Sequence, residues 1–139
     1  PSIKTLEELK SSQTSFLEMV VSQLTENNLL VDDLTKKGKT KYMGLIKLSN
    51  KHKARRIDIR FIPYLSKGAA QLYFTGSGNF NKVMRSEALK KGYTINEYGI
   101  YRANKKGRKV EKGELIPTQN ERDIFKVVEM DYLEPQDRK

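Results

Sequence analysis

The sequence contains no cysteine and only one histidine. The absence of cysteine excludes disulfide bonds and thiolate metal sites. Long apolar runs are also missing, and none approaches the roughly 18 residues that a membrane-spanning helix needs. The chain has no initiator methionine and no signal-like apolar segment, so we expect it to be part of a longer protein.

Negative charge is scarce, because 17 Asp and Glu stand against 27 Lys and Arg, which leaves a formal net charge of +10. A basic excess of this size favours a polyanionic partner, either nucleic acid or an anionic membrane surface. No basic amphipathic helix stands out. Nucleic acid is therefore the better interpretation, and no membrane partner is expected.

The 139 residues suffice for one domain or two small subdomains. Apolar spacing and capping patterns predict helices that begin near residues 5, 13, 78 and 118. Alternation and turn residues predict strands over residues 29–34, 42–48, 55–63, 71–75 and 95–102. Because strands and helices intermix without βαβ regularity, we expect an α+β fold with antiparallel pairing. The loop over 64–68 is the expected boundary, which divides the chain into residues 1–64 and 65–139.

Two of the expected helices carry an apolar stripe at helical spacing. In the helix over 13–26 the spaced residues are Phe16, Met19, Val20 and Leu24. In the helix over 78–91 the residues expected to be buried are Phe80, Val83, Met84 and Ala88.

The strand over 55–63 alternates strictly, which predicts one apolar and one charged face. The apolar face holds Ile57, Ile59 and Phe61, and the charged face holds Arg56, Asp58 and Arg60. The spacing alone is explained by an exposed strand face with an Arg–Asp–Arg ion pair. The alternative is that Asp58 binds a metal ion, although two-metal phosphoryl transfer needs several carboxylates and this strand supplies one.

A second candidate site lies at residues 73–77, which read Tyr-Phe-Thr-Gly-Ser. Gly76 suits a turn with unusual backbone angles. Asn81 and Arg85 are four residues apart, which places an amide and a guanidinium on the same face of the expected helix. Residues 73–77 could also be a buried aromatic strand followed by an ordinary turn. Asn81 and Arg85 could equally belong to a solvated polar helix face.

Taken in order, these motifs resemble those of the family X DNA polymerases, the polymerase beta family. Residues 55–60, Arg-Arg-Ile-Asp-Ile-Arg, are similar to the strand that carries the third catalytic aspartate. The resemblance covers essentially the whole chain. It implies a nucleotidyltransferase-like fragment: the antiparallel end of a catalytic palm, then a small mixed α/β nucleotide-binding thumb. The implied function is template-dependent, gap-filling DNA repair synthesis, which adds dNMP to a primer 3′-hydroxyl by two-metal phosphoryl transfer.

The resemblance assigns roles to the charged strand. The family aspartate that Asp58 matches binds the catalytic magnesium and assists deprotonation of the primer 3′-hydroxyl, with two Mg²⁺ ions in the complete site. Arg56 matches an arginine that hydrogen-bonds the aspartate cluster. Arg60 matches an arginine that changes partners when the enzyme closes, and its expected closed-state partners are Glu97 and Tyr98.

The same resemblance implies a dNTP site. Its expected nucleotide-binding residues are Tyr73, Phe74, Thr75, Gly76, Ser77 and Asn81. The two aromatic side chains would pack against the deoxyribose, and the backbone of the turn would crowd a 2′-hydroxyl. Members that work without a template carry Gly-Trp in place of Tyr-Phe, which favours template-dependent synthesis. Gly78 stands where polymerase beta has an aspartate that contacts the base, so that contact is absent.

The DNA-binding residues that the resemblance implies are Lys37, Thr40, Lys41, Lys82, Arg85 and Asn96. Residues 40–44, Thr-Lys-Tyr-Met-Gly, match a hairpin that grips template-strand phosphates, although an extra residue in the turn leaves Lys36 and Lys37 interchangeable. Lys82 would lie against the template base, and Arg85 would read the minor groove of the template strand. A solvated basic turn is the simpler interpretation of the lysines.

One part of the family signature is missing, because no Asp-x-Asp pair occurs in the sequence. We therefore expect the isolated chain to be inactive without the N-terminal half of the polymerase. The alternative function is a non-catalytic module that binds gapped or primer-template DNA and a nucleotide. An RNA-binding α+β domain ranks lower, because no RNP-like aromatic motif is present. A nuclear location is expected, with a viral or organellar one as the alternative.

Overall fold

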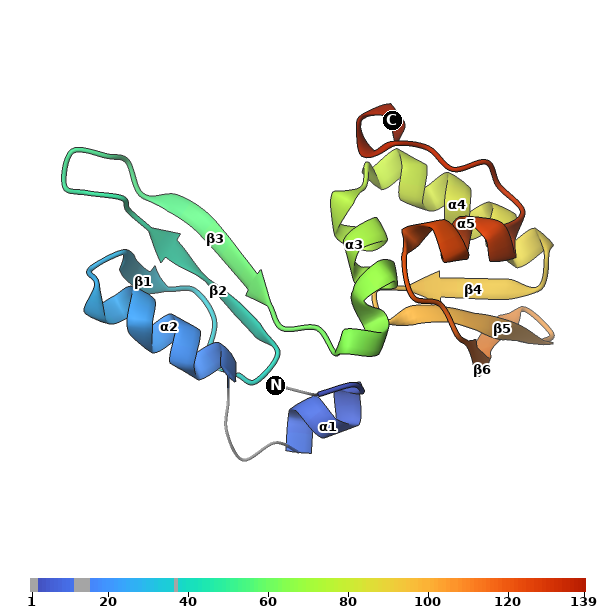
Figure 1. Ribbon diagram of the computed structural model, residues 1–139, viewed down its shortest axis with the longest axis horizontal. Helices are drawn as coiled ribbons and strands as arrows, with labels where there is room; N and C mark the ends of the chain where they lie inside the picture. Colours follow the sequence, from blue (N-terminus) through green and yellow to red (C-terminus); the bar gives the residue numbers. More distant parts are fainter. Residues whose placement is uncertain (1–2, 12–15, 37) are drawn as a thin grey trace. The chain divides into compact units, whose positions relative to one another are not determined.

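The computed structural model describes residues 3–11, 16–36 and 38–139, which form two compact units joined between Ile62 and Pro63 (Figure 1). The units are Ile3–Ile62 and Pro63–Lys139. Each has a three-stranded antiparallel sheet and an apolar core, so the expected α+β fold class is confirmed. Within the described residues, no helix has the length and apolar character needed to cross a membrane.

The first unit packs a helix against a small sheet. Its elements are α1 (Leu6–Ser11), α2 (Phe16–Glu26), β1 (Leu30–Asp33), β2 (Lys41–Ile46) and β3 (Arg55–Arg60). β2 lies between β1 and β3 and pairs antiparallel with both. Leu17 and Val21 of α2 pack with Tyr42 of β2 and with the apolar face of β3. The predicted division of β3 into an apolar and a charged face is therefore confirmed.

The first two helices differ in how well their sequence signals predicted them. The cap at Thr5 is confirmed, since its Oγ1 accepts a hydrogen bond from the backbone N–H of Glu8 at 3.2 Å. The expected start of the second helix at Gln13 lies outside the described residues. Its expected apolar stripe is wrong in phase, because Leu17 and Val21 are buried whereas Met19 is 55% exposed. Residues four apart share a helix face, and the sheet covers the face that holds Leu17.

Tyr42 is the largest fully buried side chain, and its hydroxyl donates a hydrogen bond to Oδ1 of Asp33 at 2.6 Å. Gly44 lies two residues further along the same strand face and leaves room for the ring. A Cβ at Gly44 would lie 2.2 Å from the Tyr42 hydroxyl oxygen. Burial, followed by the hydrogen bond and charge of Asp33 and by the charge of Asp32, raises the pKa of Tyr42 to about 12.

We expect Tyr42 to make the fold sensitive to alkali. Its pKa rises from 10.0 to about 12 on folding, so the neutral phenol is stabilised in the folded chain. This stabilisation is complete below pH 10.0 and is lost as the pH rises through about 12. A spectrophotometric titration should find one tyrosine that ionises near pH 12, and at lower pH in an Asp33→Asn variant. Ionisation of every tyrosine near pH 10.0 would contradict this account.

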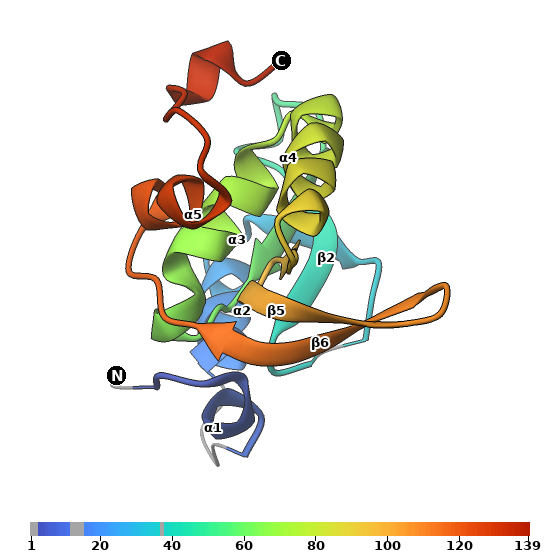
Figure 2. The same ribbon diagram turned by 90° about the vertical axis from the view of Figure 1, so that its right-hand side faces the viewer.

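The second unit covers one face of its sheet with three helices (Figures 1 and 2). Its elements are η1 (Tyr64–Ser66), α3 (Lys67–Thr75), α4 (Gly78–Lys90), β4 (Tyr93–Asn96), β5 (Gly99–Lys106), β6 (Lys109–Ile116), α5 (Glu121–Val128) and η2 (Pro135–Asp137). The strand order is β4-β5-β6. The core residues are Ala69, Leu72, Phe80, Met84, Ala88, Ile100, Ile124, Phe125 and Val128.

The strand expected over 71–75 is wrong, because this segment is the second half of α3. Aromatic residues have high strand propensity, but the preceding alanines favour a helix. Ala69, Ala70 and Leu72 bury the face of α3 that packs on the core. Tertiary packing thus decides the conformation, and the aromatic residues that suggested a strand, Tyr73 and Phe74, lie on the exposed part of the helix.

Three further expectations need correction. The strand over 95–102 is two strands, β4 and β5, with a turn at Glu97 and Tyr98, and β6 was not predicted. Val83 is 56% exposed, although the rest of its expected stripe is buried. The last helix is capped by Asn120, whose Oδ1 accepts from the backbone N–H of Asp123 at 3.0 Å, and not by Thr118.

Candidate functional site

The candidate site centres on the turn between α3 and α4. Gly76 has φ +69° and ψ −150°, a region that is essentially restricted to glycine, as the sequence predicted. The Oγ of Ser77 accepts a hydrogen bond from the backbone N–H of Phe80 at 3.2 Å and caps α4. The turn thereby places the exposed end of α3 next to the first turn of α4.

Two aromatic side chains stand at the end of α3. Tyr73 is 37% exposed and Phe74 is 51% exposed. Their rings meet edge to face with centroids 5.0 Å apart. These rings can pack against the apolar face of a ligand that enters beside the turn.

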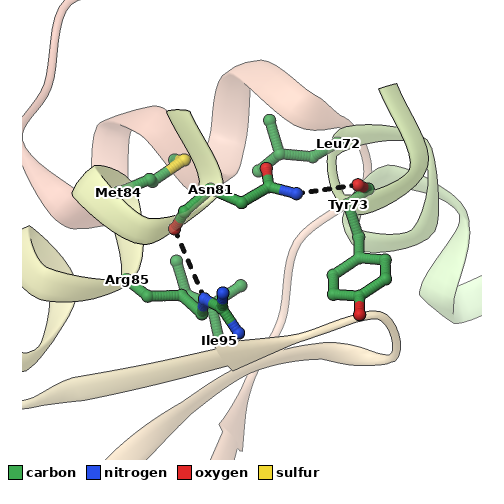
Figure 3. A pocket seen from close by; sticks show the side chains of 6 residues that line it. All are labelled: Leu72, Tyr73, Asn81, Met84, Arg85 and Ile95. Atoms are coloured by element: carbon green, nitrogen blue, oxygen red, sulfur yellow. Dashed lines mark hydrogen bonds between the residues drawn. The ribbon is translucent and has the colours of Figure 1, made fainter. Parts of the chain in front are cut away.

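A shallow pocket lies between α3, α4 and β4 (Figure 3). It is open to solvent, and its lining residues are Leu72, Tyr73, Asn81, Met84, Arg85 and Ile95. Asn81 Nδ2 donates to the backbone oxygen of Tyr73 at 2.9 Å, and Arg85 Nε donates to the backbone oxygen of Asn81 at 3.4 Å. The amide and guanidinium thus lie on one face of α4, as their spacing predicted, and both line this pocket.

Two other residues of α4 flank the site. Lys82 is exposed. Gly78 is the first residue of α4, and a Cβ there would meet no atom within 4 Å. A side chain at this position would therefore fit without moving the turn.

Asn96 has a clear structural role. Its Oδ1 accepts hydrogen bonds from the backbone N–H groups of Tyr98 at 2.8 Å and Gly99 at 3.1 Å, which closes the turn between β4 and β5. This turn carries Glu97 and Tyr98. Burial, followed by the electrostatic influence of Glu97 and Tyr98, raises the pKa of Tyr101 on the neighbouring strand.

The charged face of β3 holds an ion pair. Arg56 donates a hydrogen bond to Oδ1 of Asp58 at 2.9 Å, and the two side chains are 58% and 50% exposed. Arg60 lies on the same face and is half-buried. Arg60 belongs to the first unit, whereas Glu97 and Tyr98 belong to the second, so their predicted pairing stays a prediction.

The expected DNA-binding turn is described in part. Lys37 lies outside the described residues. The backbone oxygen of Thr40 accepts a hydrogen bond from the N–H of Phe61 at 2.9 Å, which fixes the turn against β3. Lys41 is exposed at the first position of β2. Its charge is thus available to an anionic ligand.

A contact from the C-terminal segment was not predicted. The side chain of Arg138 is fully buried, forms an ion pair with Glu121 of α5 and donates to the backbone oxygen of Leu133 at 3.0 Å. The guanidinium also lies 5.4 Å from the ring centre of Phe125. The backbone oxygen of Arg138 accepts a hydrogen bond from the N–H of Ser77 at 3.1 Å. The chain end thereby supports the turn of the candidate site.

Comparisons with known proteins identify the family. Family models match the chain as DNA polymerase beta palm over residues 3–64 and DNA polymerase beta thumb over residues 70–139. DNA polymerase lambda of Rattus norvegicus is 35% identical over 135 residues, which cover 91% of this chain and 24% of the relative. DNA polymerase lambda of Arabidopsis thaliana is 27% identical over 139 residues, which cover 91% of this chain and 26% of the relative. DNA polymerase IV of Saccharomyces cerevisiae is 31% identical over 84 residues, which cover 60% of this chain and 13% of the relative.

The chain therefore spans about a quarter of the length of the lambda relatives. The two matched ranges include Asp58 and the turn after Thr75. The match to both family models also agrees with the observed pair of small antiparallel sheets. The chain belongs to family X of the DNA polymerases.

Proposed function

We propose that this chain is the nucleotide-selecting part, and one side of the catalytic centre, of a template-dependent DNA polymerase that fills gaps during repair. One observation carries the proposal. Tyr73, Asn81 and Arg85 line one pocket, and Phe74 and the turn at Gly76 follow Tyr73 directly in sequence, in a chain of this family. The match to the polymerase beta palm and thumb supports assigning nucleotide binding to this group of residues.

In the proposed site the deoxyribose of a dNTP packs on Tyr73 and Phe74. The backbone at Thr75 and Gly76 is proposed to crowd a 2′-hydroxyl, which would favour deoxynucleotides. Ser77 holds the turn through its cap on α4. The support for this arrangement is the exposure of both rings beside a turn with a glycine-specific conformation.

Asn81 and Arg85 are the proposed readers of the new base pair. All correct base pairs present acceptors in the minor groove, so donors placed there check the shape of a pair without choosing a base. Both side chains donate to backbone oxygens of the chain itself. Asn81 would exchange its bond for one to the incoming base, and Arg85 for one to the template strand. Lys82, exposed on the same helix, would lie against the template base.

Asp58 is the proposed metal ligand and Arg56 the residue that orients it. A carboxylate is the kind of hard oxygen ligand that Mg²⁺ prefers, and Asp58 is half-exposed on its strand. Among the described residues no group of three or more His, Cys, Asp or Glu could hold a metal ion. We propose that the N-terminal half of the polymerase supplies the Asp-x-Asp pair. Two bound Mg²⁺ ions would supply charge neutralisation and activation of the primer hydroxyl.

The remaining assignments concern DNA and domain closure. Thr40 and Lys41, with Lys37 beside them in sequence, are proposed to grip template phosphates, and Asn96 to contact DNA near the β4–β5 turn. We propose that Arg60 takes Glu97 and Tyr98 as its partners in the closed state of the enzyme. A nuclear location is proposed, with a viral or organellar one as the alternative.

A non-catalytic DNA- and nucleotide-binding module is the second candidate function. The observation that favours it is the single matched carboxylate on β3. The two functions differ in one property, because only the polymerase forms a new phosphodiester bond once the remaining carboxylates are present.

The test uses a chimera, in which the Asp-x-Asp region of another family X polymerase is joined to the N-terminal end of this chain. Arg85→Ala in the chimera should lower insertion of the correct dNTP much more than insertion of a mismatched one. A lost hydrogen bond from a charged donor costs roughly 1.5–3 kcal/mol. We therefore expect roughly a ten- to hundredfold loss for the correct nucleotide. The measurement is single-nucleotide insertion efficiency on a one-nucleotide gap.

Lys90→Ala is the matched control, because Lys90 is exposed on the same helix and pairs with Glu87 at 3.0 Å. It should change the insertion efficiency of neither the correct nor the mismatched dNTP. Equal losses for correct and mismatched nucleotides in Arg85→Ala would mean that Arg85 positions DNA without checking the base pair. The 139-residue chain alone is expected to give no product.

A further inference from the structure

The hairpin of β5 and β6 extends beyond the helices of the second unit (Figure 2). None of the side chains over residues 102–115 is buried. A two-stranded ribbon without an apolar face is at best marginally stable by itself in water. The core of the unit therefore does not explain why the chain keeps an extension of this length.

The charge of this extension is strongly positive. Its basic residues are Arg102, Lys105, Lys106, Arg108, Lys109 and Lys112, and its acidic residues are Glu111 and Glu114. Both acidic residues already face a cation, since Glu111 lies 3.6 Å from Lys106 and Glu114 lies 3.7 Å from Arg102. Within the described part of the chain, Lys105, Arg108 and Lys109 have no ion-pair partner.

The register brings like charges together at the tip. Lys106 is directly paired with Lys109 across the hairpin, and Lys105 and Arg108 flank this pair. Like charges directly opposite each other destabilise a strand pair. A bound polyanion would remove this repulsion, so the arrangement is better suited to the bound state than to the free one.

We propose that the tip of the β5–β6 hairpin, residues 105–109, binds the phosphate backbone of double-stranded DNA without regard to sequence. A two-stranded ribbon with lysines on both faces fits the backbone, and a ribbon also has the dimensions to enter the major groove. An anionic membrane is a poorer partner, because membrane binding needs apolar anchors and residues 105–109 include no large apolar side chain. This contact goes beyond the proposed polymerase site, none of whose residues lies in the hairpin tip.

The test measures binding of the 139-residue chain to a short blunt-ended duplex that has no gap and no primer terminus. The hairpin variant is Lys105→Gln/Arg108→Gln/Lys109→Gln. Each phosphate contact contributes about 0.9 to the slope of log affinity against log salt, so three contacts contribute about 2.7. Between about 50 and 200 mM salt, the affinity of the unmodified chain should therefore fall about 40-fold more than that of the variant.

The control variant, Lys10→Gln/Lys67→Gln/Lys126→Gln, removes the same charge from exposed positions on α1, α3 and α5. It should keep the salt slope of the unmodified chain, as should Lys105→Arg/Lys109→Arg. Equal slopes for the hairpin variant and the unmodified chain would overturn the proposal, as would binding to anionic phospholipid vesicles without binding to the duplex. The assay needs no dNTP, and the insertion test of Arg85 is independent of it, so failure of one proposal is distinguishable from failure of the other.

Discussion

Replacing Asp58 with alanine in the chimera is expected to lower the rate of nucleotide insertion by at least about a thousandfold, or roughly 4 kcal/mol in the barrier. The reason is that Asp58 is the one carboxylate on β3, and the charge that develops during phosphoryl transfer is balanced by metal ions held by carboxylates. The partner Arg56 would then have no anion to orient. DNA binding should stay close to that of the unmodified chimera, because the variant removes no positive charge.

Single-turnover insertion on gapped DNA measures the rate, and a direct binding titration measures affinity for the same DNA. Asp131→Ala is the control, because Asp131 is an exposed carboxylate outside the candidate site. It should leave both values unchanged. An Asp58→Ala chimera with a rate within about tenfold of the unmodified one, under about 1.4 kcal/mol, would show that Asp58 merely forms an ion pair with Arg56.

Replacing Arg138 with alanine is expected to destabilise the second unit by about 3–5 kcal/mol. The side chain of Arg138 is fully buried, and its removal leaves the carboxylate of Glu121 without its cation in a site where Glu121 is 7% exposed. A buried charge without a partner is far more costly than the pair. The aromatic rings of Phe125 and Tyr132, each 5.4 Å from the guanidinium, would also lose their contact with it.

Denaturant unfolding of the 139-residue chain measures this effect. The double variant Arg138→Met/Glu121→Gln should recover part of the lost stability, because it leaves no unpaired charge. Arg108→Ala removes an exposed arginine and should stay within about 0.5 kcal/mol of the unmodified chain. A loss below about 1 kcal/mol for Arg138→Ala would mean that Glu121 finds another partner or becomes exposed to water.

Local patterns predicted the parts of the fold in which one face is buried and the other is solvated. The apolar face of β3 and most of the buried stripe of α4 were predicted because their periods are regular. The same reasoning failed for α3, because strand propensity at Tyr73 was outweighed by packing of Ala69 and Leu72. It missed β6 because most of that strand is exposed, apart from Ile116 at its end, and has no alternation to detect.

The candidate site was predicted best where a single segment determines it. Gly76 and the pair Asn81 and Arg85 belong to one turn and one helix, so their relation follows from local geometry. The contact of Arg138 with Glu121 could not be predicted, because two charged residues far apart in sequence look like surface charges. The role of Asn96 in closing a turn was missed, because the two strands on either side of it were taken as one.

The most direct measurement of the central claim is single-nucleotide insertion by the chimera on four gapped DNAs that differ in the templating base, with each of the four dNTPs. We expect the inserted nucleotide to follow the templating base, with the complementary dNTP preferred in every case. Asp58→Ala should abolish all four insertions. Insertion of the same nucleotide opposite every base, or no insertion when the Asp-x-Asp pair is supplied, would contradict the claim that this chain selects nucleotides for a template-dependent polymerase.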